Sequence, residues 1–339
     1  MQHKISKGKL LDSNGNVIEA GYAFSLEKEY DIKDIKAKKS RIKEWDYYYI
    51  GNDDYGIALT MDDNAYMNMM SISVLNFKEN KQVTKSYMHF FPKNRIAFPS
   101  TSKIGNISFK DKNCDMNFYN DGNERRLVCV MKNVNKNEDF SCDITLKETN
   151  QDSMVIVTPF NKPKHFYYNQ KINCLLASGS ARLGEKVYDL NGCYGVLDWG
   201  RGVWTYSNTW YWASMSGQYN GKRIGFNLGY GFGDTSAASE NMFFYNDKAY
   251  KLNDITFNIK GDGTKQIDYL SDWTFTSKDN SIFMTFKPIM DRNADTDVII
   301  IKSLQHQVFG YFSGYVMIEG EKVEFENMLG FAEKVKNCW

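Results

Sequence analysis

The chain has 339 residues, including 22 Phe, 22 Tyr and 7 Trp, and its 42 basic side chains nearly balance its 41 acidic ones. The aromatic surplus suits the pleated surface of a β-sheet and argues against an all-helical protein, and the length is enough for about two domains. A net charge of +1 provides no field that attracts a polyanion, so nucleic acid is excluded as the expected partner.

No apolar stretch of signal-peptide length occurs near the amino terminus, and the longest uncharged run, residues 202–221, is rich in Asn, Gln, Ser, Thr and Gly. That run does not qualify as a transmembrane helix. The six Cys form no C-x-x-C pair and the four His are scattered, which predicts buried, reduced thiols and no metal site. We therefore expect a cytoplasmic protein with no transmembrane segment and no cofactor.

Residues 1–43 carry ten basic and six acidic side chains, and most of the excess lies in the stretch DIKDIKAKKSRIK. Such a stretch can contact a membrane or RNA, but it is more often a solvated segment. We interpret residues 1–43 as a basic, solvent-exposed lead-in, in which Ile32, Ile35 and Ile42 allow a short amphipathic helix.

From Trp45 onward, short runs rich in Tyr, Ile, Val, Phe and Met alternate with turn clusters such as GNDD, DDNA and KENK. This spacing predicts antiparallel strands in a sandwich or barrel. Pro159 and Pro163 flank a polar connection that we take as the domain boundary. A second set of strands begins with HFYYNQKI and ends with KVEFENMLGF, so the sequence predicts two all-β modules, over residues 44–160 and 166–339.

The Asn220-Gly221 pair predicts a type I′ hairpin turn, because both positions tolerate positive φ. In that register Trp212 faces Gly229, and Ser214 faces Asn227. One face of the hairpin then carries Trp210, Trp212, Ser214, Ser216 and Asn227 among Gly225, Gly229 and Gly231, and the other face carries Tyr211, Ala213, Met215, Ile224, Phe226, Leu228 and Tyr230.

The second of these faces is ordinary core material. The first combines large rings, bare backbone and isolated polar groups, which suits the floor of a pocket for a flat or apolar ligand. In the alternative interpretation, Trp210 and Trp212 only cover the cross-strand glycines and pack against other strands.

Asp198 and Arg201 lie in DWGRG, which we expect to be a loop fixed by an ion pair between the two side chains. Alternatively, Asp198 is an acid at a pocket mouth, although a neighbouring Arg would lower its pKa. Glu240 and Asn241 follow the hairpin and are expected to reach the same face, and Glu333 is a third candidate carboxylate. Two of these carboxylates could act as an acid and base pair, as in a glycosidase.

The strings DWGRGVWTYSNTWYW, GKRIGFNLGYG, SEN, QVFGYFSGYV and GFAEKVKNCW resemble a bacterial domain-of-unknown-function family that is similar in fold to the AttH and carotenoid 1,2-hydratase group. The resemblance implies an all-β fold of two lipocalin-like, calycin-type antiparallel barrels in tandem with few short helices. Its signature positions are Asp198, Arg201, Gly202, Trp204, Trp210, Trp212, Asn227, Glu240, Asn241, Gln307, Gly310, Gly330, Glu333 and Trp339.

Our leading hypothesis is a protein that binds an apolar or ring-containing small molecule, such as a lipid or isoprenoid, in an aromatic pocket of the second barrel. If it is an enzyme, a hydratase, isomerase or cyclase reaction is expected, in which a protonated carboxyl donates to a double bond. The candidate acids are Asp198 and Glu240, and the candidate ligand-binding residues are Trp204, Trp210, Trp212, Ser214, Asn227, Arg201 and Asn241. The alternatives are a carbohydrate-binding or glycoside-processing protein and a noncatalytic structural module.

Overall fold

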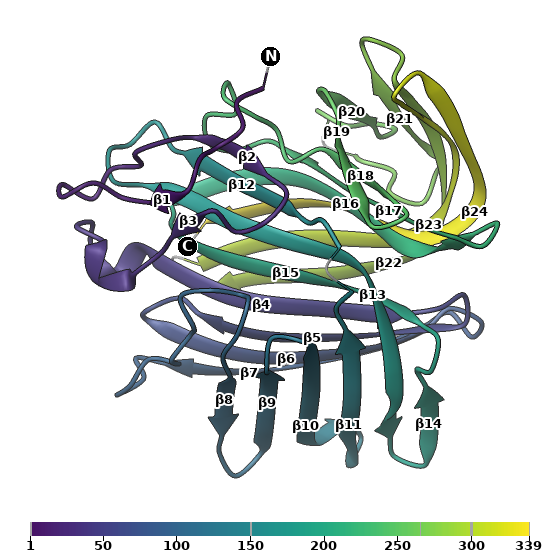
Figure 1. The fold of residues 1–339 in the computed structure, drawn as a ribbon. Helices are drawn as coiled ribbons and strands as arrows, with labels where there is room; N and C mark the ends of the chain where they lie inside the picture. Colours follow the sequence, from purple (N-terminus) through teal and green to yellow (C-terminus); the bar gives the residue numbers. More distant parts are fainter. Residues whose placement is uncertain (1, 150, 265, 299–300, 339) are drawn as a thin grey trace.

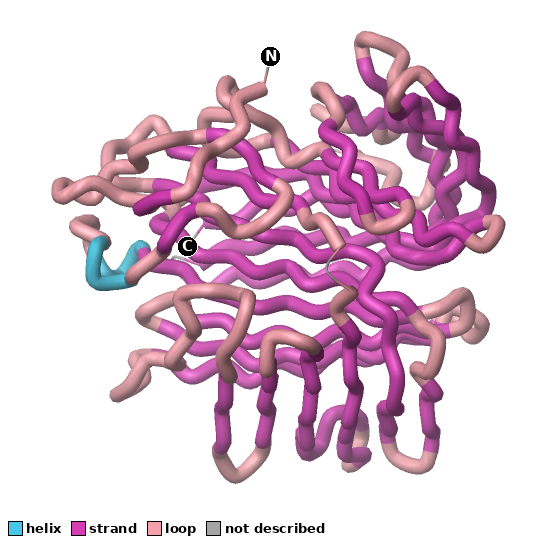
Figure 2. The backbone as a smooth tube through the Cα atoms, viewed as in Figure 1, coloured by secondary structure: helices cyan, strands magenta, loops and turns pink. Residues whose placement is uncertain are grey.

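The structure is a computed structural model that describes residues 2–149, 151–264, 266–298 and 301–338. Trp339, one of the signature positions, lies outside the described residues. Two curled antiparallel half-barrel sheets form most of the chain, as in tandem lipocalin-like barrels (Figures 1 and 2). The predicted all-β fold is confirmed.

The first sheet contains thirteen strands. Its main path runs in the order β7-β6-β5-β4-β15-β13-β11-β10-β9-β8, and β12, β14 and β2 (Gly21–Ala23) pair off this path. The strands that follow the amino-terminal segment are β4 (Ile42–Gly51), β5 (Tyr55–Asp63), β6 (Met67–Asn76), β7 (Lys81–Phe90), β8 (Ile107–Lys110), β9 (Cys114–Asn120), β10 (Glu124–Asn135), β11 (Glu138–Lys147), β12 (Met154–Pro159), β13 (Phe166–Leu183), β14 (Lys186–Asp189) and β15 (Tyr194–Val203).

The second sheet contains nine strands in the order β19-β18-β17-β16-β24-β23-β22-β21-β20. They are β16 (Ser207–Tyr219), β17 (Lys222–Tyr230), β18 (Met242–Tyr245), β19 (Lys248–Lys251), β20 (Ile255–Asn258), β21 (Trp273–Ser277), β22 (Ile282–Val298), β23 (Ile301–Ile318) and β24 (Glu321–Cys338). The chain therefore changes sheet at residues 204–206, whereas the sequence placed the domain boundary at 160–166. Strands β13 to β15 belong to the first sheet, because β15 pairs with β4 along its whole length.

The amino-terminal segment holds β1 (Gly8–Lys9), β2 (Gly21–Ala23), β3 (Lys28–Glu29) and two short 3₁₀ helices, η1 (Ile32–Asp34) and η2 (Lys39–Arg41). It is not simply a solvated lead-in. Strand β2 pairs with β12, and Lys43 at its end is fully buried on β4. The ammonium of Lys43 lies 4.3 Å from the centre of the Tyr66 ring, and burial lowers the pKa of Lys43 to about 7.

Successive side chains of a strand point to opposite faces of its sheet. Each sheet therefore has its own core, and a third apolar cluster lies between the sheets. On β4, Tyr48 and Ile50 lie in the core of the first sheet, whereas Tyr47 and Tyr49 face the second sheet and pack with Trp212, Phe309 and Phe331. The predicted core face of the β16–β17 hairpin lies in the core of the second sheet, with Ala213, Met215, Ile224, Phe226 and Leu228 buried there. The side-chain period of two thus decides which residues lie at the junction between the sheets.

The predicted hairpin register is confirmed. Asn220 and Gly221 have φ values of 49° and 75°, and Trp212 pairs with Gly229 and Ser214 with Asn227. The DWGRG segment, in contrast, is part of strand β15 and not a loop. Glycine occurs within this strand because neighbouring groups approach its backbone closely and leave no room for a side chain. A Cβ at Gly200 would lie 2.1 Å from the ring of Trp45.

Candidate functional site between the two sheets

A cavity of about 290 Å³ lies between the two sheets, and we call it the inter-sheet cavity. The first sheet contributes Trp45, Tyr47, Thr60, Asp62, Ser71, Ser86, Tyr167, Lys171 and Asp198, and the second contributes Trp210, Trp212, Arg292, Gln305, Gln307 and Glu333. Trp204, Phe232 and Glu240 complete the wall from connecting segments. The sequence placed this pocket in the second barrel, but that barrel's core face is filled by its own side chains.

Glu333 on β24 is the carboxyl group with the most defined surroundings in the inter-sheet cavity. Its Oε1 accepts a hydrogen bond of 2.9 Å from Nε1 of Trp210, and its Oε2 accepts one of 3.2 Å from Nε2 of Gln307. Burial raises the pKa of Glu333 to about 7, although the Trp210 hydrogen bond and the cations of Lys171 and Arg292 favour the charged form. Glu333 therefore holds a proton on a substantial fraction of molecules at neutral pH.

The amide of Gln307 is held in one orientation. Nη1 of Arg292 donates a hydrogen bond of 2.6 Å to Oε1 of Gln307, which leaves the amide NH₂ directed at Glu333 and, at 3.4 Å, at the hydroxyl of Tyr47. A carbonyl that already accepts from a guanidinium cannot exchange places with the NH₂ without losing that bond. Arg292 thus positions the donor to Glu333.

Asp198 faces the cavity from β15, and its partner is not the one that the sequence predicted. Oδ1 of Asp198 lies 3.0 Å from Nζ of Lys171 on β13 and accepts a hydrogen bond of 2.6 Å from Nδ2 of Asn169. The Lys171 ammonium also lies 4.1 Å from the centre of the Trp212 ring. Asp198 is therefore one half of a buried ion pair.

Arg201 points to the opposite face of β15, because it lies three positions after Asp198 and side chains alternate along a strand. Its Nη1 lies 3.0 Å from Oδ1 of Asp46, its Nε lies 3.8 Å from a carboxylate oxygen of Glu44, and its guanidinium stacks on Trp199 at 4.3 Å. The predicted pair of Asp198 with Arg201 is wrong, since it assumed a loop in which both side chains could turn toward each other.

Glu240 precedes β18 and lies over the bare backbone of Gly229, where a Cβ would come within 3.0 Å of its Oε2. Burial raises the pKa of Glu240. Asn227 links this residue to the hairpin, since it accepts a hydrogen bond of 2.6 Å from Nε1 of Trp212 and donates one of 3.0 Å to the backbone carbonyl of Glu240. Asn241 accepts from the backbone N–H of Gly229 at 2.9 Å.

Part of the hairpin face predicted as a ligand floor is covered by protein. At Gly225 a Cβ would lie 2.7 Å from Sγ of Cys174, which sits with φ of 60° at a bulge in β13. The neighbouring Asn173 amide is within hydrogen-bond distance of the Ser214 and Ser216 hydroxyls and of the Phe226 carbonyl. This bulge joins the first sheet to the second, so only the Trp210 and Trp212 end of the face borders the inter-sheet cavity.

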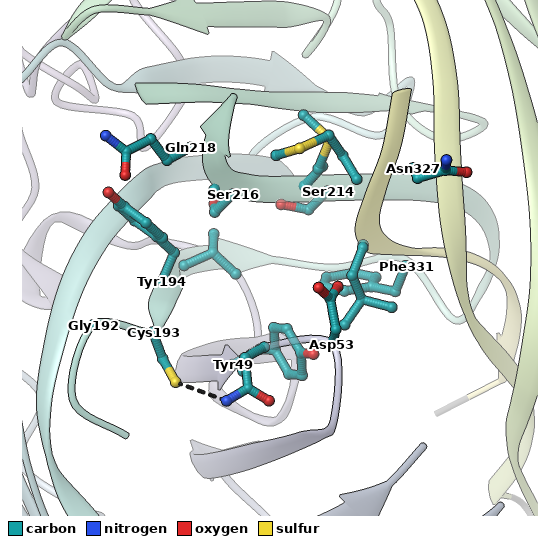
Figure 3. Close-up of a pocket in the computed structure, with 18 residues that line it drawn as sticks. Tyr49, Asp53, Gly192, Cys193, Tyr194, Ser214, Ser216, Gln218, Asn327 and Phe331 are labelled. Carbon is teal, nitrogen blue, oxygen red and sulfur yellow. Dashed lines mark hydrogen bonds between the residues drawn. The ribbon is translucent and has the colours of Figure 1, made fainter. Parts of the chain in front are cut away.

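Ser214 lines a second, smaller cavity of about 180 Å³, which Tyr49, Cys193, Tyr194, Ser216, Gln218 and Phe331 also line (Figure 3). Of the predicted site residues, the inter-sheet cavity brings together Asp198, Glu240, Trp204, Trp210 and Trp212. Ser214, Asn227, Arg201 and Asn241 do not line it. Reasoning from the sequence missed Lys171, because HFYYNQKI reads as ordinary strand and gives no sign that this Lys points inward.

No group of three or more His, Cys, Asp or Glu side chains within the described ranges is arranged to hold a metal ion. Five of the six Cys are buried free thiols, as predicted, and Cys338 is half-buried. In the described part of the chain, no helix is long and apolar enough to cross a membrane.

Two solved structures are similar in fold. A protein from Nitrosomonas europaea, provisionally named AttH, matches with a TM-score of 0.56 at 11% identity, covering 92% of this chain and 98% of that one. Kievitone hydratase from Nectria haematococca matches with a TM-score of 0.51 at 13% identity, covering 98% and 97%. No curated protein matches the chain in sequence. The sequence model of the domain of unknown function DUF2804 matches residues 2–339, and the chain belongs to this family.

Proposed function

We propose that the inter-sheet cavity binds an apolar or ring-containing small molecule and adds water across one of its carbon–carbon double bonds. The observation that carries this proposal is Glu333, a buried carboxyl with a pKa raised to about 7 in an aromatic cavity. A general acid works best when its pKa lies near the working pH. The fold similarity to kievitone hydratase supports the same reaction class.

In the proposed reaction, Glu333 donates its proton to one alkene carbon, and the electron pair of the double bond forms the new C–H bond. The other carbon becomes cationic, and the indole faces of Trp210 and Trp212 stabilise it through their quadrupoles. Water then bonds to that carbon and loses a proton to Asp198. Return of that proton to Glu333 through solvent completes the cycle, so alkene and water yield an alcohol.

Each carboxylate has a different proposed role because its surroundings differ. Asp198 is paired with Lys171, which suits an anionic base. Glu240 is buried and its pKa is raised, which makes it a second acid candidate. Environments that separate the protonation states of neighbouring carboxyl groups are typical of acid and base pairs in enzymes.

Ligand binding is tested by the quenching of Trp fluorescence on addition of farnesol or oleic acid. Catalysis is tested by incubation of the same compounds in ¹⁸O-labelled water, followed by mass spectrometry of the alcohol product. Glu333→Gln should bind the compound and incorporate no label. Glu326→Gln, at an exposed position on the same strand, serves as the matched control and should keep wild-type incorporation. Equal incorporation by both variants would contradict Glu333 as the acid.

A carbohydrate is the second candidate ligand. Thr60, Ser71, Thr84 and Ser86 give the wall from the first sheet a row of hydroxyl groups, and Asp62 adds a carboxyl. Sugar rings combine apolar faces with many hydroxyl groups, so they match a wall of this kind opposite Trp side chains. Quenching by soluble glycans in place of farnesol and oleic acid would favour this candidate.

A further inference from the structure

The basic stretch near the amino terminus contributes to a further surface concavity, of about 480 Å³, that lies outside the inter-sheet cavity. We call it the basic cavity. It is lined by Ala37, Lys38, Arg41, Lys162, Pro163, Lys164, His165, Thr205 and Tyr206. Three segments far apart in sequence therefore meet here: the η2 region, the connection between β12 and β13, and the connection between the two sheets.

Every ionisable lining group other than Tyr206 is basic, and no carboxylate lines the cavity. Among the described residues, Lys38, Lys162 and Lys164 make no ion pair. Like charges gathered without counter-charges repel each other and attract anions. The basic cavity therefore has a local positive field, although the whole chain is nearly neutral.

The wall of the basic cavity also includes His165, which has a buried polar atom without a partner in the described structure. The side chain is 6% exposed. Its Nδ1 lies 2.8 Å from the carbonyl oxygen of Pro163, whereas its Nε2 is buried without a hydrogen-bond partner in the described structure. Because the Pro163 carbonyl only accepts, Nδ1 carries the proton, and the neutral imidazole presents a lone pair at Nε2. Burial lowers the pKa of His165, and the cations of Lys162 and Arg41 lower it further.

A phosphate group matches these features because it combines negative charge, several acceptor oxygens and, in its monoanionic form, a P–O–H donor. The acceptor oxygens suit the ammonium groups of Lys38, Lys162 and Lys164, and the hydroxyl suits Nε2 of His165. A carboxylate that is ionised has no proton to donate to Nε2. We propose that the basic cavity is a binding site for the phosphate group of a small molecule or a lipid headgroup.

The basic cavity adjoins the inter-sheet cavity through the connection between the sheets. Nε of Arg41 donates a hydrogen bond of 2.8 Å to the backbone carbonyl of Trp204, and Nη2 donates one of 2.5 Å to the carbonyl of Thr205. Trp204 is itself a wall of the inter-sheet cavity. The residues proposed to bind phosphate are different from those proposed to carry out hydration, so the phosphate site does not depend on the proposed hydration reaction.

The test titrates histidine-labelled protein with inorganic phosphate and follows the four imidazole signals by NMR, with His165→Asn used to assign the signal of His165. The His165 signal should move to saturation, and those of His3, His89 and His306 should not. In Lys162→Gln/Lys164→Gln the affinity for phosphate should fall about tenfold, as expected when two attractive charges are removed. The charge-matched control is Lys222→Gln/Lys278→Gln, at exposed positions at the start of β17 and in the turn after β21.

A second arm measures co-sedimentation with vesicles of equal parts phosphatidylcholine and phosphatidic acid. Loss of inorganic phosphate binding in Lys162→Gln/Lys164→Gln assigns the site to a soluble phosphate-bearing ligand, and loss of vesicle binding alone assigns it to a lipid headgroup. If both double variants bind phosphate and vesicles as the unmodified protein does, or if the His165 signal does not respond to either probe, the site is overturned. Thermal unfolding of both double variants shows that they are folded.

Discussion

The indole N–H of Trp210 on β16 donates a hydrogen bond of 2.9 Å to Oε1 of Glu333 on the adjacent strand β24. This bond joins the aromatic hairpin, which was conspicuous in the sequence, to a carboxyl group more than a hundred residues away. It also holds the carboxyl at the wall of a cavity whose other half comes from the first sheet. The acid and the rings that surround it are therefore positioned by one strand pairing.

Replacement of Glu333 by Gln should change how stability depends on pH. The pKa of Glu333 is about 7 in the folded chain and near 4.5 ordinarily. Because the folded value is raised, its contribution to stability is fully present below about pH 4.5 and is lost as pH rises through about 7. Relative to wild type, Glu333→Gln should gain on the order of 3 kcal/mol between about pH 4 and pH 8.

Urea unfolding at the two pH values measures this difference, with Glu326→Gln as the control that should show no gain. A stability difference between wild type and Glu333→Gln that stays constant from acid to alkaline pH would mean that the carboxyl has an ordinary pKa.

Replacement of Trp210 by Phe should raise the pKa of Glu333 further. The indole N–H favours the ionised carboxylate, and a hydrogen bond to a charged group contributes about 1.5–3 kcal/mol, which corresponds to an increase of about one to two units. The pKa can be read from the carboxyl ¹³C signal of Glu333 during a pH titration. Trp212→Phe is the matched control, because the Trp212 indole donates to Asn227 and not to Glu333. An equal increase in both variants would point to a general change in packing.

Much of the fold followed from local features of the sequence. The Asn220-Gly221 turn fixed the pairing of Trp212 with Gly229, because a two-residue loop leaves one register. Alternation then separated the core face of the hairpin from the face with Trp210 and Trp212. These predictions depend only on backbone geometry within about twenty residues, and tertiary contacts did not change them.

The location and partners of the site could not be predicted in the same way. Lys171 meets Asp198 because β13 and β15 are neighbours, and strand order in a sheet is set by non-local packing. The Pro-flanked connection at 160–166 looked like a boundary, yet β13 returns to the first sheet. For the same reason the cavity was assigned to one barrel, although its walls come from both.

Truncation of Trp212 to Ala should destabilise the fold strongly, by about 3–5 kcal/mol. The side chain is 7% exposed, with its ring 4.8 Å from that of Phe331 and 6.0 Å from that of Tyr47. Trp210 is only half-buried, so Trp210→Ala should cost less while it abolishes the fluorescence response to a ligand. Denaturant unfolding of both variants measures the two losses of stability, and ligand titration of each variant measures its fluorescence response. A small loss for Trp212→Ala would show that its ring serves the ligand more than the junction between the sheets.

The buried ion pair of Lys171 with Asp198 should show strong coupling in a double-mutant cycle. The two side chains are 4% and 11% exposed, and their charged atoms lie 3.0 Å apart. Lys171→Met leaves the Asp198 carboxylate buried beside the Asn169 amide that donates to its Oδ1, and Asp198→Asn leaves the Lys171 ammonium over the Trp212 ring. Removal of one partner of a buried pair typically costs about 3–5 kcal/mol, because the other charge stays uncompensated.

The double variant Lys171→Met/Asp198→Asn removes both charges, so its loss of stability should be well below the sum of the two single losses. Urea unfolding of the wild type and the three variants at one pH gives the coupling free energy. The exposed pair of Arg126 with Asp143, whose side chains are 53% and 54% accessible, provides a reference cycle in which coupling should be at most about 1 kcal/mol. Additive losses at Lys171 and Asp198 would show that solvent reaches this pair, and the base proposed for the hydration step would then be screened from the lysine that holds its charge.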